Sequence, residues 1–182
     1  MRKSIGQWNP VKLFRTKIPD GLLKDILLLI LKIAAVILIF SFIFSLMFGI
    51  VQYKDSSMIP AIKEKDIAFF YRYRDGYIAG DVIALRYEGK VQLRRIIAVE
   101  DDIVDITEAG LKLNGSLQQE WGIYQDTRKS DEGIEFPVTV PKGYIFVMGD
   151  NREEAVDSRI YGCVRIKETL GRVITVFRGK RL

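Results

Sequence analysis

The chain has 182 residues, a hydrophobic fraction of 48% and a formal charge of +5. This length accommodates one domain and an anchor. The charge is confined to residues 1–51, which carry seven basic and two acidic side chains, whereas the other 131 residues carry 21 of each. Because the larger part of the chain is neutral, the basic surface of a nucleic-acid-binding protein is missing, and no nucleic-acid partner is expected.

The chain contains no histidine and one cysteine, Cys163. Nucleophiles activated by histidine are therefore excluded, the commonest metal ligand is missing, and no intrachain disulfide can form. We expect no metal and no cofactor. A serine nucleophile in this chain would need a lysine or a carboxylate as its base.

An uncharged apolar run of about nineteen residues extends from Ile33 to Val51. At 1.5 Å per residue it spans roughly 28 Å, enough for the hydrocarbon core of a bilayer. It is too long and starts too late for a cleavable signal peptide. Because positive charge stays on the cytoplasmic side, we expect residues 1–30 to be a basic cytoplasmic tail, 31–51 a transmembrane helix and 52–182 an extracytoplasmic domain of a single-pass cell-membrane protein.

Beyond Tyr53, short runs of β-branched and aromatic residues alternate with Gly, Asn and Asp, which is typical of antiparallel strands joined by tight turns. We predict one mainly β domain, with a helical turn only at Ile166–Leu170. The polar residues 118–135 are expected to form an exposed loop. The predicted strands are Ile67–Tyr73, Asp81–Tyr87, Val91–Val99, Ile103–Ile106, Leu111–Leu113, Tyr144–Met148 and Arg172–Phe177.

A serine follows the apolar run by about six residues, in the segment Asp55-Ser56-Ser57-Met58-Ile59-Pro60. Further motifs follow in the order Gly80-Asp81-Val82-Ile83, Arg94-Arg95-Ile96-Ile97, Gly149-Asp150-Asn151-Arg152 and Asp157-Ser158-Arg159. Counted with the serine segment, and with the last two motifs taken as one, these are four boxes, and in this order behind an N-terminal anchor they resemble the type I signal peptidases, membrane-anchored serine proteases, in their Gram-positive form. The resemblance implies a transmembrane helix followed by an antiparallel-sheet catalytic domain that removes signal peptides from exported preproteins.

The resemblance also implies roles for individual residues. Ser57 takes the position of the nucleophile, and Arg94 that of the general-base lysine. The residues expected at the substrate-binding or oxyanion region are Asp55, Ser56, Met58 and Pro60. Those expected to give structural support are Arg95, Asp150, Ala155, Asp157, Ser158 and Arg159, with Arg95 pairing with Asp150.

Several positions depart from the family pattern. Arg94 stays protonated at neutral pH and cannot act as a general base. Ala155 replaces a serine whose hydroxyl helps to hold the lysine amine in the family. Asp55 would oppose a developing oxyanion if it faced the site. We hypothesise that Asp55 and Arg94 form an ion pair where the lysine amine would lie. Lys90, four residues before Arg94 and roughly 13 Å away along the strand, is too distant to replace it.

Two functions remain open. The first is an active membrane serine endopeptidase that cuts preproteins after small residues at positions −1 and −3. The second is a catalytically impaired signal-peptidase-like protein, a pseudoenzyme that acts as an assembly or chaperone-like factor for exported surface proteins such as pili. The expected partners are signal peptides, membrane lipid and components of secretion or pilus assembly.

Overall fold

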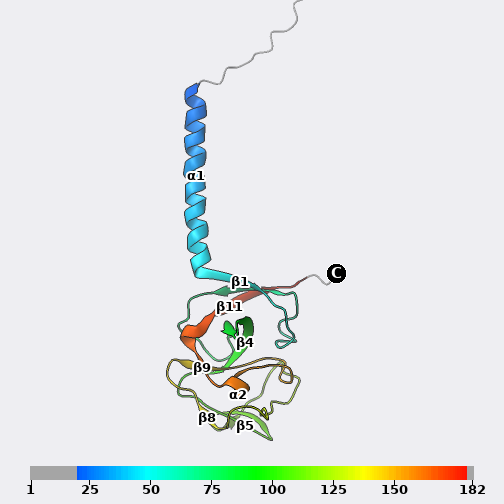
Figure 1. The fold of residues 1–182 in the computed structure, drawn as a ribbon. Helices are drawn as coiled ribbons and strands as arrows, with labels where there is room; N and C mark the ends of the chain where they lie inside the picture. Colours follow the sequence, from blue (N-terminus) through cyan, green and yellow to red (C-terminus); the bar gives the residue numbers. More distant parts are fainter. Residues whose placement is uncertain (1–19, 180–182) are drawn as a thin grey trace, which may run out of the picture. The chain divides into compact units, whose positions relative to one another are not determined.

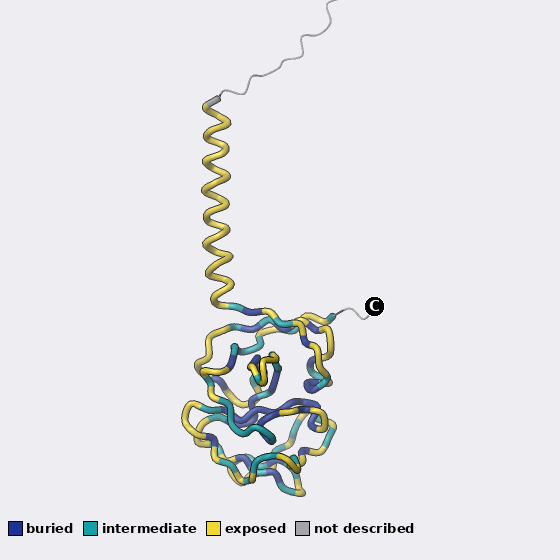
Figure 2. The backbone as a smooth tube through the Cα atoms, in the orientation of Figure 1, coloured by how far each residue is buried: buried dark blue, intermediate teal, exposed yellow. Residues whose placement is uncertain are grey.

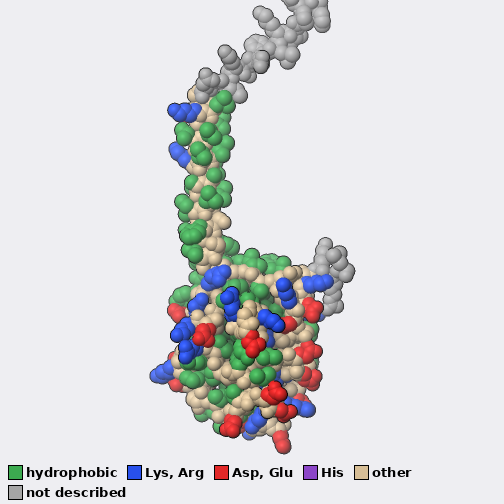
Figure 3. All heavy atoms as spheres, viewed as in Figure 1, with side chains coloured by type: hydrophobic (Ala, Val, Ile, Leu, Met, Phe, Trp, Pro, Cys, Tyr) green, Lys and Arg blue, Asp and Glu red, His purple; other side chains and the backbone are tan. Residues whose placement is uncertain are grey.

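The computed structural model describes residues 20–179. It divides into an N-terminal unit that ends at Phe42 and a second unit that begins at Ile43. The first element, helix α1, covers Asp20–Met47. Its segment Gly21–Met47 is long and apolar enough to cross a membrane, and the residues of this segment are exposed (Figures 2 and 3). A helix that is apolar on all sides and unburied fits a lipid environment.

The helix differs in its bounds from the predicted segment 31–51. It begins earlier, at Asp20, and it ends at Met47. The next residues form strand β1, Phe48–Gln52, which pairs antiparallel with β2, Ile67–Tyr71. An apolar run of this kind suits a helix or a buried strand equally well, so its periodicity alone does not place the boundary. Of the expected tail, residues 1–19 lie outside the described part of the chain.

Two antiparallel sheets build the second unit (Figure 1). The seven-stranded sheet has the order β1-β2-β11-β3-β4-β9-β10, and the four-stranded sheet the order β7-β6-β5-β8. In Figure 1 the smaller sheet lies at the opposite end of this unit from β1. The remaining elements are β3 Val82–Tyr87, β4 Lys90–Ala98, β5 Ile103–Thr107, β6 Gly110–Leu113, β7 Ser116–Leu117, β8 Val138–Thr139, β9 Tyr144–Met148, α2 Ser158–Tyr161, β10 Val164–Arg165, the 3₁₀ turn η1 Ile166–Glu168 and β11 Thr169–Phe177.

The predicted fold class, a mainly β domain behind one N-terminal apolar helix, is confirmed. Each of the seven predicted strands is present with an end shifted by at most three residues, and β9 has the predicted bounds. The predicted helical turn is η1, but the prediction that it is the only one is wrong, because Ser158–Tyr161 form the short helix α2. Residues 118–135 form no helix or strand, and Trp121 and Tyr124 are exposed there.

Three apolar clusters form the core of the second unit. One of them joins Tyr53 and Met58 to Phe70 of β2 and Leu93 of β4. Tyr53 and Met58 lie on either side of Ser57 in sequence, so their burial anchors the Ser57 loop on the large sheet on both sides of the serine. The position of Ser57 is therefore set by core packing.

Candidate active site

A cleft of about 750 Å³ lies beside the Ser57 loop. Its lining comes from the end of β1, from residues 54–57, from β4 and from residues 154–156. Ser57 and Arg94 both line it although they are nearly buried, with 4% and 2% of their surface exposed. A hollow of about 960 Å³, lined by β5, β6 and residues 118–129, contains none of the predicted site residues.

The Ser57 hydroxyl has three short polar contacts. Its Oγ lies 2.6 Å from Asp55 Oδ1, 2.7 Å from Arg94 Nη1 and 2.6 Å from Tyr53 Oη. An ionised carboxylate can only accept and a guanidinium can only donate, so Ser57 donates its single proton to Asp55. It then accepts hydrogen bonds from Arg94 and from the Tyr53 hydroxyl. The hydroxyl is held by both a negative and a positive group.

Asp55 is fixed by the backbone as well. The Ser57 N–H donates to Asp55 Oδ1 at 2.9 Å, the same oxygen that accepts from Ser57 Oγ. A bond from an aspartate to the N–H two residues later is an Asx turn, which sets the direction of the carboxylate. Burial acts to raise the pKa of Asp55, but the hydrogen bonds from the Ser57 side chain and backbone and the charge of Arg94 outweigh it, so the pKa lies below its ordinary value.

Arg94 is positioned from three sides. It lies within β4, where it pairs with Ile83 of β3. Its Nε and Nη2 donate to the Val156 carbonyl at 3.2 and 2.9 Å, and its Nη1 donates to the Leu93 carbonyl at 2.6 Å as well as to Ser57. The hypothesis of a direct Asp55–Arg94 ion pair is wrong. Among residues 20–179 the two side chains form no direct ion pair, and each instead contacts Ser57 Oγ.

Tyr53 and Glu154 join the site without having been predicted. The Tyr53 side chain is 2% exposed, and burial together with the neighbouring Asp55 carboxylate raises the pKa of its hydroxyl. Glu154 lines the cleft and accepts a hydrogen bond from the Ser56 hydroxyl. The only sequence signal for Tyr53 is a hydroxyl-bearing residue four positions before the serine. Glu154 has no such signal, because its contact spans 98 positions.

The residues expected around the nucleophile divide into two groups. Asp55 and Ser56 line the cleft together with Ser57. Met58 is fully buried in the core, and neither Met58 nor Pro60 lines this cleft. Met58 anchors the loop through its place in the core.

The turn after β9 holds the Ser57 loop by its backbone. The Asn151 N–H donates to the Ser57 carbonyl at 3.0 Å, and the Asn151 side chain donates to the Ser56 carbonyl at 3.3 Å. Asp150 accepts two hydrogen bonds from Arg95, at 2.8 and 2.6 Å. A side chain at Gly149 would place its Cβ 2.5 Å from the Ser57 carbonyl oxygen. Glycine therefore permits the close approach of the two segments.

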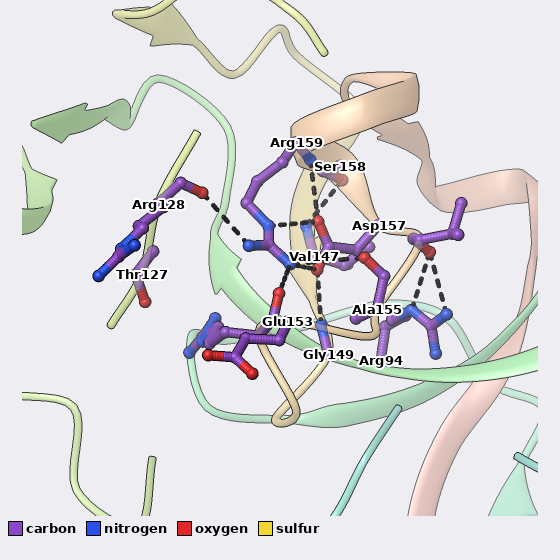
Figure 4. A network of polar contacts seen from close by, with 12 residues as sticks. Arg94, Thr127, Arg128, Val147, Gly149, Glu153, Ala155, Asp157, Ser158 and Arg159 are labelled. Carbon is purple, nitrogen blue, oxygen red and sulfur yellow. Dashed lines mark hydrogen bonds and ion pairs between the residues drawn. The ribbon is translucent and has the colours of Figure 1, made fainter. Parts of the chain in front are cut away.

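A second buried ion pair supports this turn from behind (Figure 4). Asp157 is fully buried; one carboxylate oxygen accepts from Arg159 Nε at 2.9 Å, and the other accepts from the Gly149 N–H at 3.0 Å. Ser158 accepts a hydrogen bond from the Val147 N–H at 3.0 Å. In Figure 4 the Arg159 side chain lies alongside the Asp157 carboxylate. Ala155 is buried, and its carbonyl accepts from Arg159 at 3.4 Å.

Metal ligation has no support among residues 20–179, where no group of three or more Cys, Asp or Glu side chains is arranged to hold an ion. The chemistry that this arrangement can perform is nucleophilic attack by a hydroxyl. The oriented Ser57 proton and its carboxylate acceptor are two features of a hydroxyl nucleophile paired with a base.

Comparisons with known proteins agree on one family. Residues 25–178 match the model described as "Signal peptidase, peptidase S26". Thylakoidal processing peptidase 1 of Arabidopsis thaliana is 35% identical over 103 residues, which cover 57% of this chain and 26% of that protein. Signal peptidase I of Bacillus licheniformis is 30% identical over 115 residues, which cover 57% of this chain and 62% of that protein. The match thus spans about a quarter and about three fifths of these two relatives.

Two further matches also carry the name signal peptidase I. Signal peptidase I U of Bacillus subtilis is 29% identical over 144 residues, which cover 74% of this chain and 75% of that protein. Among solved structures, a signal peptidase I from Enterococcus faecalis is 26% identical, with a TM-score of 0.46; the match covers 56% of this chain and 98% of that one.

Proposed function

Because this chain belongs to the signal peptidase family, peptidase S26, we propose that it is a membrane-anchored serine endopeptidase that removes signal peptides from exported preproteins. The observation that carries this proposal is the Ser57 hydroxyl. It lies at a cleft, its proton is directed to Asp55, and Arg94 Nη1 lies 2.7 Å from its oxygen. Cleavage occurs after small residues at positions −1 and −3 of the preprotein.

The proposed topology follows from the charge pattern. Basic residues precede the apolar helix, so the N-terminal tail stays in the cytoplasm and the second unit faces the outside. The substrate is then the extended end of a signal peptide at the outer surface of the membrane. The partners are exported preproteins and membrane lipid.

A second function is favoured by the same hydroxyl. Arg94 replaces the lysine base, and all the hydrogen-bonding positions of Ser57 Oγ are filled. A chain that binds preproteins but does not cut them would act as an assembly or chaperone-like factor for exported surface proteins such as pili, with components of secretion or pilus assembly as its partners.

The two functions are separated by incubating the full chain, solubilised in detergent, with a preprotein that carries Ala at positions −1 and −3. We expect a single cut after the −1 residue. The Ser57→Ala variant should bind the same preprotein without cutting it. Binding by the wild-type chain without any Ser57-dependent cut would replace the first function by the second.

A further inference from the structure

We propose that Asp55 is the general base that deprotonates Ser57, a catalytic role that the family resemblance gives to a lysine. This inference rests on the proposed endopeptidase function. The geometry that carries it is the 2.6 Å contact between Asp55 Oδ1 and Ser57 Oγ, in which the serine must be the donor. A general base has to lie within about 2.6–3.2 Å of the atom whose proton it takes, and Asp55 meets this condition.

The surroundings of Ser57 offer no other base. Arg94 and Tyr53, the other two groups in contact with Oγ, are both donors to it. Lys54 and Lys90 line the same cleft, yet neither is among the hydrogen-bond partners of Ser57 in the described part of the chain. The carboxylate is thus the acceptor of the hydroxyl proton.

Asp55 is also placed so that it can take up a proton from Ser57 and release it again. The Asx turn holds its Oδ1 toward Ser57, while the residue itself remains exposed at the cleft. A base in this position can receive a proton from the buried hydroxyl and deliver it to a group bound in the cleft. A fully buried carboxylate such as Asp157 has no such access.

Arg94 takes the complementary electrostatic role. Its guanidinium is charged at every working pH, and its Nη1 lies 2.7 Å from the oxygen that becomes negative when Ser57 loses its proton. The contacts to the Val156 and Leu93 carbonyls hold this cation in place before the reaction. A fixed cation beside this oxygen favours the loss of the Ser57 proton.

In the proposed reaction, Asp55 carries the proton in each step. Ser57 Oγ transfers its proton to Asp55 Oδ1 and bonds to the scissile carbonyl carbon, whose oxygen becomes an oxyanion. When this intermediate collapses, the C–N bond breaks, and Asp55 returns the proton to the leaving amine. Water then attacks the acyl-serine and gives one proton to Asp55. The ester bond breaks, and that proton returns to Ser57 Oγ. The signal peptide is released with a carboxylic acid end, which gives its remaining proton to the solvent and becomes a carboxylate.

This chemistry predicts a characteristic pH dependence. The charged and titratable groups around Asp55 are Tyr53 on its own loop and Arg94 on β4, with Lys54, Lys90 and Glu154 on the walls of the cleft. Because the pKa of Asp55 is lowered, the base is ionised at neutral pH and remains so into the acidic range. Activity should therefore persist at pH 5 and should fall only as Asp55 is protonated.

The test compares the wild-type chain with Asp55→Asn, Asp55→Glu, Ser57→Ala and the exposed control Asp131→Asn, all full length and in detergent. Two rates are measured from pH 4 to 9: preprotein cleavage, and Ser57-dependent hydrolysis of p-nitrophenyl acetate, which needs no signal-peptide recognition. We expect Asp55→Asn to slow ester hydrolysis about 10²-fold or more, Asp55→Glu to recover part of it, and Asp131→Asn to match the wild type.

The outcomes separate this inference from the proposed function. Asp55-dependent ester hydrolysis without preprotein cleavage would support Asp55 as the base and would overturn the endopeptidase function. Ester hydrolysis unchanged or faster in Asp55→Asn, or absent from the wild-type chain, would overturn Asp55 as the base. Equal thermal unfolding midpoints of wild type and Asp55→Asn, together with the partial recovery by glutamate, would exclude a loss of folding as the cause.

Discussion

Position 94 decides what kind of chemistry the site can perform. A lysine there could lose its proton and act as a base, whereas the guanidinium of Arg94 cannot. The structure uses the extra donors of arginine, since Nε and Nη2 both bind the Val156 carbonyl while Nη1 reaches Ser57. A lysine has one nitrogen and could not make these contacts together. The arginine is therefore built into the geometry of the site.

Replacing Arg94 by lysine and Ala155 by serine rebuilds the arrangement that the family resemblance implies. Burial lowers the pKa of a lysine, so part of the amine becomes neutral at alkaline pH. Preprotein cleavage by Arg94→Lys/Ala155→Ser should then rise about tenfold per pH unit below the pKa of that lysine, whereas cleavage by the wild-type chain should not. The measurement is the cleavage rate from pH 5 to 10.

The exposed substitution Arg128→Lys serves as the control and should leave the wild-type profile unchanged. A wild-type profile that rises with pH in the same way as that of the double variant would contradict a carboxylate base. Cleavage only by the double variant would assign the impaired, non-cutting function to the natural chain.

At the scale of elements, the site depends on the contact between the Ser57 loop and the turn that follows β9. The two meet through the Asn151–Ser57 backbone hydrogen bond and the absence of a side chain at Gly149. The turn is itself supported by the Arg95–Asp150 and Asp157–Arg159 pairs. Both pairs include a carboxylate that is almost wholly buried, and removing its partner typically costs about 3–5 kcal/mol.

We expect Gly149→Ala to destabilise the second unit by about 1–3 kcal/mol and to lower the activity of Ser57. The added methyl group would lie 2.3 Å from Ala155 Cβ and 2.5 Å from the Ser57 carbonyl oxygen, so one of the two segments must move. Chemical denaturation followed by circular dichroism measures the change. Gly21→Ala is the matched control, because its Cβ would meet no atom within 4 Å. Equal stability of Gly149→Ala and wild type would count against the contact.

Local patterns made most elements predictable, and long-range contacts account for the rest. Alternating apolar residues and turn signals identify strands such as β3 and β9. β1 escapes prediction because its apolar residues continue those of α1, and only pairing with β2 makes them a strand. At the site, motif order places Ser57 and Arg94 together, and the structure brings them within 2.7 Å. Tyr53 could not be found this way, because its contact depends on how the loop turns.

For the whole molecule, one buried carboxylate ties the start of the β domain to its end. Asp66 accepts hydrogen bonds from the Lys63 and Gly179 N–H groups at 3.0 Å and from Arg178 at 2.7 Å. Burial acts to raise the pKa of Asp66, but these three donors outweigh it and hold the pKa below its ordinary value. The carboxylate therefore stabilises the fold when it is ionised.

This tie predicts how stability depends on pH. A lowered folded-state pKa adds stability above the unfolded value of about 3.9, and this stability is lost as the pH falls through the folded-state pKa. Asp66→Asn should be less stable than wild type at pH 7 and should lose less stability between pH 5 and 3. Denaturation curves across this range measure how the free energy of unfolding of each variant changes with pH. Asp131→Asn should show the same change as wild type. The same change in Asp66→Asn would contradict a stabilising role of the Asp66 carboxylate.

The strand that directly follows the apolar helix has a consequence for any soluble form of this protein. Cutting the chain after Val51, where the uncharged run ends, would remove four of the five residues with which β1 covers β2. β2 would then become an open sheet edge carrying Ala68, Phe69 and Phe70, and exposed apolar edges pair with other chains and aggregate. The ring of Phe48 also stacks on Phe69, at 5.1 Å between centroids. The helix can be removed only up to Met47 if the sheet is to keep its protecting edge.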